Sequence, residues 1–171
     1  MIKLNRSDSY LDKILKSFGF LGIIFMFAHL FIVWLDLPET VPTHFNFWGE
    51  PDGFGAKGNM LILPFVALGT YIMLTLISRF PNAFNYPENI TAAQKQYLYV
   101  NSRRMLNWLN LQIVYFFLYG TWKTTQIALE KQTGLATYSL PIFLVAMTIT
   151  MAYYIIKGFR ITKTIKENGG P

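Results

Sequence analysis

The sequence predicts an all-α integral membrane protein, a four-helix bundle with both termini in the cytoplasm and an ordered outer loop between the first and second spans. Three observations lead to this fold class. Hydrophobic residues make up 53% of the 171 residues and charged residues only 14%, whereas about a quarter of an ordinary soluble domain is charged. The mean hydropathy is positive, at +0.32. Four apolar segments are each long enough to cross the hydrocarbon core of a bilayer.

The four predicted spans belong to a single membrane domain, residues 1–171. The first segment reaches about 30 Å as a helix, which is enough to cross the core. It is too long for the apolar region of a signal peptide and no small-residue cleavage site follows it, so we expect an uncleaved anchor. The spans cover residues 17–37, 60–78, 105–127 and 138–156, and the outer loop covers residues 38–59.

Local signals predict where several helices begin. Ser7 or Ser9 is a candidate cap for a short basic interfacial helix that leads into the first span. Thr91, with Gln94 three residues later, is a candidate capping box for a helix that opens at Ala92 and runs on into the third span. Pro64 and Pro141 fall in the first turns of the second and fourth spans, where a helix tolerates proline.

The basic residues indicate the orientation. Twelve of the 15 Lys and Arg side chains lie in residues 1–16, 79–104 and 157–166, whereas the 38–59 loop holds only Lys57 and the region from Lys123 to Thr137 holds Lys123 and Lys131. The positive-inside rule therefore predicts that both termini are cytoplasmic and that the 38–59 loop is outside. Anionic lipid headgroups account for the net charge of +6, so we expect no nucleic-acid partner.

The outer loop contains the first candidate site. Its polar and aromatic residues suit three interpretations: a tight structural turn around Pro51-Asp52-Gly53, a surface that binds a partner, or a metal site. A metal would be held by His44, Glu50 and Asp52. The chain has no cysteine, which excludes disulfides and zinc sites of the cysteine type. The candidate binding residues are His44, Phe45, Asn46, Gly49, Glu50, Asp52 and Lys57.

Polar residues inside the predicted spans form the second candidate site. His29 and Asp36 are seven residues apart, and so lie on one helical face, where they suit either packing between helices or a proton relay. The third span carries two polar stripes that include Asn107, Asn110 and Gln112. Amides of this kind bond across helices for roughly 1 kcal/mol each. They also suit the lining of a ligand path.

Sequence motifs of the common catalytic classes are missing. The chain has no H-E-x-x-H, no G-x-S-x-G, no P-loop and no dinucleotide fingerprint, and no soluble segment is long enough to form a catalytic domain. We therefore expect a protein that is not an enzyme and that uses no cofactor.

The loop from Pro38 to Lys57, with its P-x-H-F-N-x-x-G-x-P-D-G core, resembles a known signature. It is similar to the domain of unknown function at the front of SdpI-type immunity proteins, and the resemblance covers about residues 17 to 80. It implies a bacterial cytoplasmic membrane protein with no known catalysis. Relatives of that type protect a cell from a secreted toxic peptide and signal to a cytoplasmic repressor. They carry an additional multi-span half, whereas this chain has four predicted spans.

Three functional hypotheses follow. The first is a non-enzymatic membrane protein with an immunity or sensing role, whose outer loop binds a peptide or a lipid-like molecule. Its expected partners are the lipid bilayer, a secreted peptide or envelope protein, and a cytoplasmic regulator. The second is a metal-assisted membrane enzyme that uses the loop histidine and carboxylates. The third is an accessory subunit of a transporter, with His29 and the amides of the third span facing a path.

Overall fold

The computed structural model describes residues 7–80, 84–86 and 90–167. Four helices and a two-stranded hairpin make up this part of the chain. The elements in chain order are α1 (Tyr10–Val33), β1 (Thr40–Phe45), β2 (Pro51–Ala56), the 3-10 helix η1 (Lys57–Leu61), α2 (Ile62–Ile77), α3 (Ala92–Ala128) and α4 (Ser139–Glu167).

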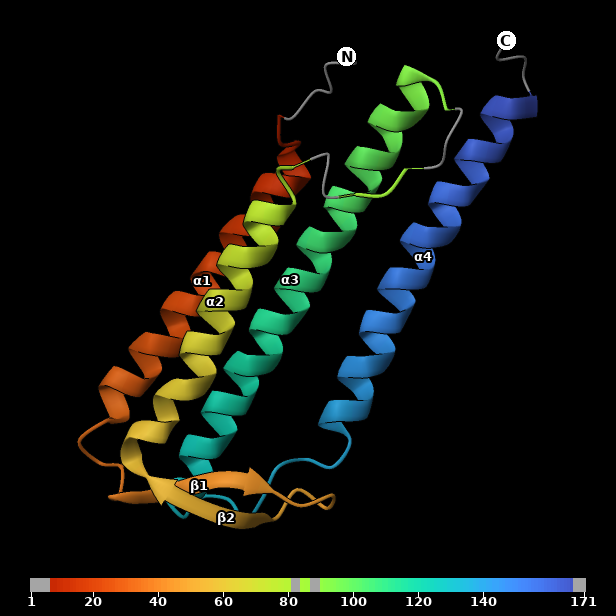
Figure 1. The fold of residues 1–171 in the computed structure, drawn as a ribbon. Coiled ribbons are helices and arrows are strands. Elements are labelled where there is room, and N and C mark those ends of the chain that lie inside the picture. The colour runs from red at the N-terminus through yellow and green to blue at the C-terminus, as the bar shows by residue number, and fades with distance from the viewer. Residues whose placement is uncertain (1–6, 81–83, 87–89, 168–171) are drawn as a thin grey trace.

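The helices run side by side and the hairpin lies across one end of them (Figure 1). We call this end the hairpin end. The start of α1 and the end of α4 both lie at the opposite end, on either side of α3, and we call this the terminal end. The ordered outer loop that we expected at 38–59 contains two strands that we did not predict, so the fold is mostly helical rather than all-α.

Helix α3 is the centre of the structure. It packs against α1, α2 and α4, whereas α4 makes almost all of its helix contacts with α3. The predicted four-helix bundle is therefore a three-helix core with α4 docked along α3. At 37 residues, α3 is about 55 Å long, which exceeds the thickness of a bilayer core.

Three helices of the described residues are long and apolar enough to cross a membrane. They are Tyr10–Val33, Lys57–Ile77 and Ser139–Arg160. We predicted a fourth span at 105–127. Its helix, α3, is long enough but carries too many polar residues to be apolar enough for a membrane span by composition. Its polar side chains are buried against the other helices, and a helix surrounded by protein need not be apolar. The chain is thus a multi-pass membrane protein by the length and composition of its helices.

The outward faces of the apolar helices expose large hydrophobic side chains, as contact with a bilayer requires. Phe31 on α1, Phe65 on α2 and Ile149 on α4 are all exposed. Two small clusters form the interior. One joins Ile23, Met26, Ala67 and Val114, and the second joins Leu30, Leu37, Val41 and Met60 beneath the hairpin.

Two capping boxes define helix starts. Thr91 and Gln94 exchange side-chain and backbone hydrogen bonds at the start of α3, which confirms the predicted box and the unbroken helix that follows it. At α1 the cap is Ser9, paired with Asp12. The separate interfacial helix that we predicted before the first span is instead the first turns of α1 itself, because no residue between Tyr10 and Val33 breaks the helix.

The hairpin pairs its strands in antiparallel register from Thr40↔Ala56 to Phe45↔Pro51. β1 is rich in strand-forming residues, and Pro51 stands at the start of β2, where its missing N–H is tolerated. The register shifts on both sides of His44. A bulge of this kind bends a strand and re-aims the side chain at the shift.

Candidate functional site

The tip of the hairpin is organised by Asn46. Its side-chain oxygen accepts hydrogen bonds from the backbone N–H groups of Trp48 (2.9 Å) and Glu50 (3.0 Å), and its Nδ2 donates to the Glu50 carboxylate at 3.1 Å. Such a local network is how asparagine fixes a tight turn. Asn46 and Glu50 therefore have a structural role at the tip.

Gly49 completes the turn. Its φ of +80° lies in the region that favours glycine, and a Cβ at this position would sit 2.4 Å from the Leu135 carbonyl oxygen. The Leu135 N–H donates to the Gly49 carbonyl at 2.7 Å. The tip is thus attached to the segment between α3 and α4, which the sequence did not indicate.

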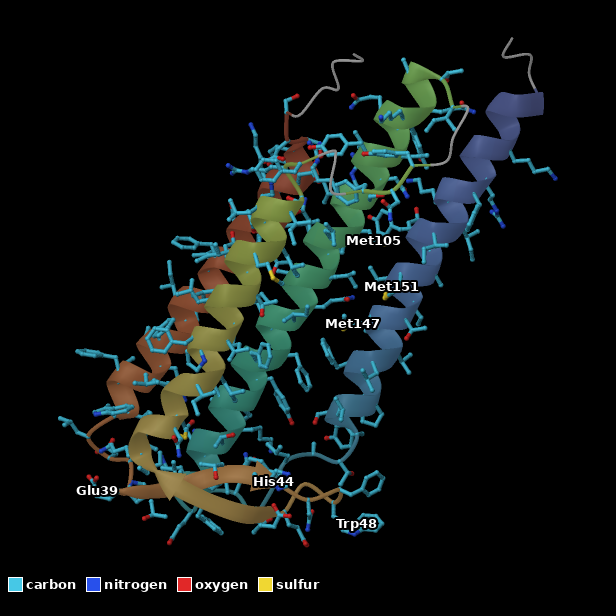
Figure 2. All side chains as sticks on the ribbon, viewed as in Figure 1. Glu39, His44, Trp48, Met105, Met147 and Met151 are labelled. Atoms are coloured by element: carbon cyan, nitrogen blue, oxygen red, sulfur yellow. The ribbon has the colours of Figure 1, made fainter. Side chains whose placement is uncertain are left out.

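His44 and Asp52 form an exposed pair across the hairpin. The distance from His44 Nδ1 to the Asp52 carboxylate is 2.5 Å, and the His44 side chain is 74% exposed. Figure 2 shows His44 on the hairpin and Trp48 at its tip. An exposed pair contributes little to stability. Because both side chains are exposed, they are accessible to a partner from solution.

The structure separates the three residues of the metal alternative. Asp52 pairs with His44, but Glu50 turns to Asn46. Within residues 7–80, 84–86 and 90–167, no three His, Cys, Asp or Glu side chains are grouped so that they could share a metal ion. Lys57, the last predicted loop residue, lies with its Nζ 5.4 Å from the centre of the Trp34 ring.

A cavity of about 290 Å³ lies beneath the hairpin. Phe45 on β1 forms part of its roof, Leu63 on α2 and Gly120 on α3 form its walls, and Leu135 closes one side. The full lining is Pro42, Thr43, Phe45, Asn59, Met60, Ile62, Leu63, Phe116, Phe117, Gly120, Thr121, Thr124 and Leu135.

Thr121 is a polar residue in the lining of this mainly apolar cavity. The residue is 1% exposed, and its hydroxyl has no hydrogen-bond partner among the described residues. A buried hydroxyl without a partner is costly, at about 1–3 kcal/mol. Only the fold brings this part of α3 beneath the hairpin.

The amides of α3 each reach a different neighbouring helix. Asn107 Nδ2 donates to Asp12 on α1 at 3.0 Å, Asn110 Nδ2 donates to the Tyr71 carbonyl of α2 at 3.2 Å, and Gln112 Nε2 donates to Thr150 on α4 at 2.9 Å. These side chains therefore serve to hold three helices around α3, and they do not line one continuous path.

His29 and Asp36 lie apart in the structure. His29 Nε2 is 2.7 Å from Thr125 Oγ1 on α3, whereas Asp36 is exposed in the turn that follows α1. The Thr125 hydroxyl already donates to the Trp122 carbonyl at 2.6 Å. Since a hydroxyl has only one proton, His29 donates from Nε2. His29 thus links α1 to α3.

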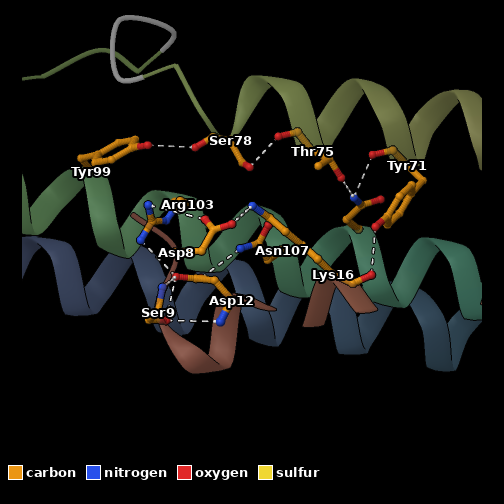
Figure 3. Close-up of polar contacts among 11 residues, drawn as sticks. Asp8, Ser9, Asp12, Lys16, Tyr71, Thr75, Ser78, Tyr99, Arg103 and Asn107 are labelled. Carbon is orange, nitrogen blue, oxygen red and sulfur yellow. Dashed lines mark hydrogen bonds and ion pairs between the residues drawn. The ribbon is translucent and has the colours of Figure 1, made fainter. Parts of the chain in front are cut away.

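A buried ionic cluster that the sequence did not reveal lies at the terminal end (Figure 3). Asp12 is 0% exposed and Arg103 is 2% exposed, and their closest N–O distance is 3.0 Å. The second Asp12 oxygen accepts the bond from Asn107, and Ser9 completes the carboxylate's partners from its backbone and hydroxyl. Both oxygens of the carboxylate are thus bonded to protein groups.

Neighbouring residues extend this cluster. The Asp8 carboxylate binds Lys16 at 2.8 Å and lies 3.8 Å from Arg103. Arg103 also lies over the Tyr99 ring, whose hydroxyl donates to the Ser78 carbonyl at 3.3 Å. The available sequence signal was the S-x-x-D box at Ser9, which marked a helix start but gave no sign of a partner 91 residues away.

The region matched by a known family contains the hairpin and parts of α1 and α2, the helices that flank it. Residues 21–68 match a family described as a domain of unknown function (DUF1648). A protein of Archaeoglobus fulgidus, described as an uncharacterized protein, is 36% identical over 83 residues, which is 44% of this chain and 45% of the archaeal protein. The chain thus spans about half the length of that relative. Neither description names the immunity proteins that the loop resembles, and no solved structure matches the chain.

Proposed function

We propose that the protein is a non-enzymatic membrane protein that binds an amphiphilic peptide at its hairpin end. The observation that carries the proposal is the cavity beneath the hairpin with the buried Thr121 hydroxyl inside it. Its volume of about 290 Å³ is at the small end of ligand sites. It therefore suits one apolar side chain or chain end of a larger ligand, with a polar group that reaches Thr121.

The surface around the cavity favours a peptide as the larger ligand. Phe47, Trp48 and Phe54 are exposed on the hairpin, and aromatic residues are enriched where proteins bind one another. The exposed His44–Asp52 pair adds hydrogen-bonding groups on the same element. With the positive-inside orientation, this end faces away from the cytoplasm and meets secreted molecules. The resemblance to peptide-immunity proteins agrees with this role.

The test compares peptide binding by two variants that add the same side-chain volume at different positions. Gly120 lines the cavity, and a Cβ there would meet only Leu63 at 3.6 Å, so Gly120→Leu fills the space without a backbone clash. Gly69 is exposed on α2, and a Cβ there would meet nothing within 4 Å. Gly69→Leu is therefore the matched control, with the same added volume outside the cavity.

The measurement is the affinity of the protein in nanodiscs for a panel of synthetic amphiphilic peptides, with lysophosphatidylcholine as a lipid comparison. We expect the wild type and Gly69→Leu to bind a peptide equally and Gly120→Leu to lose about tenfold or more in affinity. If Gly120→Leu binds the peptide as tightly as the wild type does, the cavity is not the binding site. If the protein binds lysophosphatidylcholine and none of the peptides, its ligand is a lipid and not a peptide.

A further inference from the structure

A second cavity lies at the terminal end, away from the hairpin. It has a volume of about 280 Å³ and opens between α3, α4 and the segment at 84–86. Leu98, Met105, Ile155 and Phe159 are apolar residues of its lining. The full lining is Asn85, Tyr86, Leu98, Asn101, Ser102, Met105, Tyr154, Ile155, Gly158 and Phe159. Such a surface suits a hydrocarbon chain.

Two buried polar atoms of this cavity have no partner among the described residues. They are the Tyr86 hydroxyl and the Asn101 Oδ1. Asn101 is 8% exposed, and its Nδ2 donates to the Tyr154 carbonyl at 2.8 Å. Because that carbonyl can only accept, the orientation of the amide is fixed and Oδ1 is the free acceptor. The cavity therefore offers one hydroxyl donor and one carbonyl acceptor.

Lys95 brings positive charge to the lining residue Tyr86, and two further basic residues are close to lining residues in the sequence. Lys95 Nζ lies 5.0 Å from the centre of the Tyr86 ring. Arg104 follows Asn101 by one helical turn on α3, and Lys157 lies beside the lining residue Gly158 on α4. Burial, with a smaller contribution from neighbouring Tyr99, raises the pKa of Tyr86 to about 12, so its hydroxyl is a donor at neutral pH.

We infer that this cavity is a binding site for an anionic phospholipid whose headgroup carries hydroxyls. Basic pockets between membrane helices on the cytoplasmic side recognise such headgroups. Here Lys95, with Arg104, faces the phosphate, and Tyr86 donates to it. A headgroup hydroxyl donates to Asn101 Oδ1, and an acyl chain covers Leu98 and Phe159. The lining residues Gly158 and Phe159 lie near the end of the apolar segment Ser139–Arg160 of α4, between Lys157 and Arg160, which is the level of lipid headgroups.

The experiment is native mass spectrometry of the full chain with equal amounts of dioleoyl phosphatidylglycerol and dioleoyl phosphatidylcholine. We expect the wild type to retain one phosphatidylglycerol with about tenfold preference. Tyr86→Phe removes a hydroxyl that has no partner among the described residues, so the fold is unaffected and the preference falls about tenfold. Lys95→Gln lowers it about fivefold.

Two controls match these changes at the other end of the molecule. Tyr138→Phe and Lys131→Gln alter exposed residues near the hairpin, and both should retain the wild-type preference. Equal retention of the two lipids by the wild type would overturn the inference, as would an unchanged preference in Tyr86→Phe. If soluble glycerol phosphate displaces the lipid at millimolar concentration, the headgroup alone suffices and the assignment to a phospholipid is wrong. Peptide binding at the hairpin is a separate readout, unaffected by Tyr86→Phe.

Discussion

The Asp12 carboxylate on α1 and the Arg103 guanidinium on α3 lie 3.0 Å apart, and both are buried. This pair joins the first turn of the chain's first helix to its central helix. A buried ion pair is a weak net stabiliser when it is intact, but the loss of one partner leaves an uncompensated charge. The pair therefore fixes which helices meet at the terminal end.

Arg103→Met should lower the free energy of unfolding by about 3 kcal/mol or more, because Asp12 loses its counter-charge. A double variant that combines Arg103→Met with Asp12→Asn should recover much of this loss, since the new amide is neutral and keeps an acceptor oxygen. Arg79→Met, at an exposed arginine, is the control. Thermal unfolding in detergent measures all of them, and a double variant less stable than Arg103→Met would contradict the charge argument.

Gly49→Ala should destabilise the hairpin tip by about 1 kcal/mol or more, because the residue has a positive φ and its Cβ would collide with Leu135. Gly58→Ala is the matched control, since a Cβ there meets nothing within 4 Å. Limited proteolysis of the hairpin in folded protein provides the readout. Equal protection of the two variants would show that the contact with Leu135 is dispensable.

The bond between His29 and Thr125 should appear as coupling in a double-mutant cycle. With His29→Leu and Thr125→Val, we expect a coupling energy of about 0.6 kcal/mol, the average for polar contacts between membrane helices. Thr121→Val replaces a hydroxyl that has no described partner, so its cycle with His29→Leu should give a coupling near zero. Coupling of the same size in both cycles would mean that the 2.7 Å contact is not its source.

The orientation can be tested with single cysteines, because the native chain contains none. Phe54→Cys on the hairpin and Lys163→Cys near the end of α4 both replace exposed residues. In intact cells, an impermeant maleimide should label the cysteine at position 54 and leave the one at position 163 unlabelled until the cells are opened. The reverse pattern would invert the topology and remove access of a secreted peptide to the hairpin.

Turn and cap chemistry made part of the fold readable from the sequence. The Thr91–Gln94 box and the proline at the start of α2 both depend on residues within a few positions of each other. Hydropathy identified the three apolar helices for the same reason, since composition alone decides whether a segment suits a bilayer. The tight turn predicted around Pro51-Asp52-Gly53 was wrong in position, because those residues begin β2 and the chain turns earlier, between Asn46 and Gly49, where Asn46 bonds the backbone and Gly49 takes a positive φ. The strands of the hairpin were not predicted, because Gly53 and Gly55 weaken the alternation that marks β2.

The sequence by itself determined that the chain belongs in a membrane, which segments are apolar enough to cross it, and where its basic residues gather. Only the tertiary structure decided that Asp12 meets Arg103, that Thr121 lies under the hairpin, and that α4 docks along α3. The physical reason is the separation along the chain of the residues on which each property depends. Burial preference and backbone conformation are properties of neighbouring residues, whereas a buried polar contact depends on how helices far apart in the chain rotate and pack against one another.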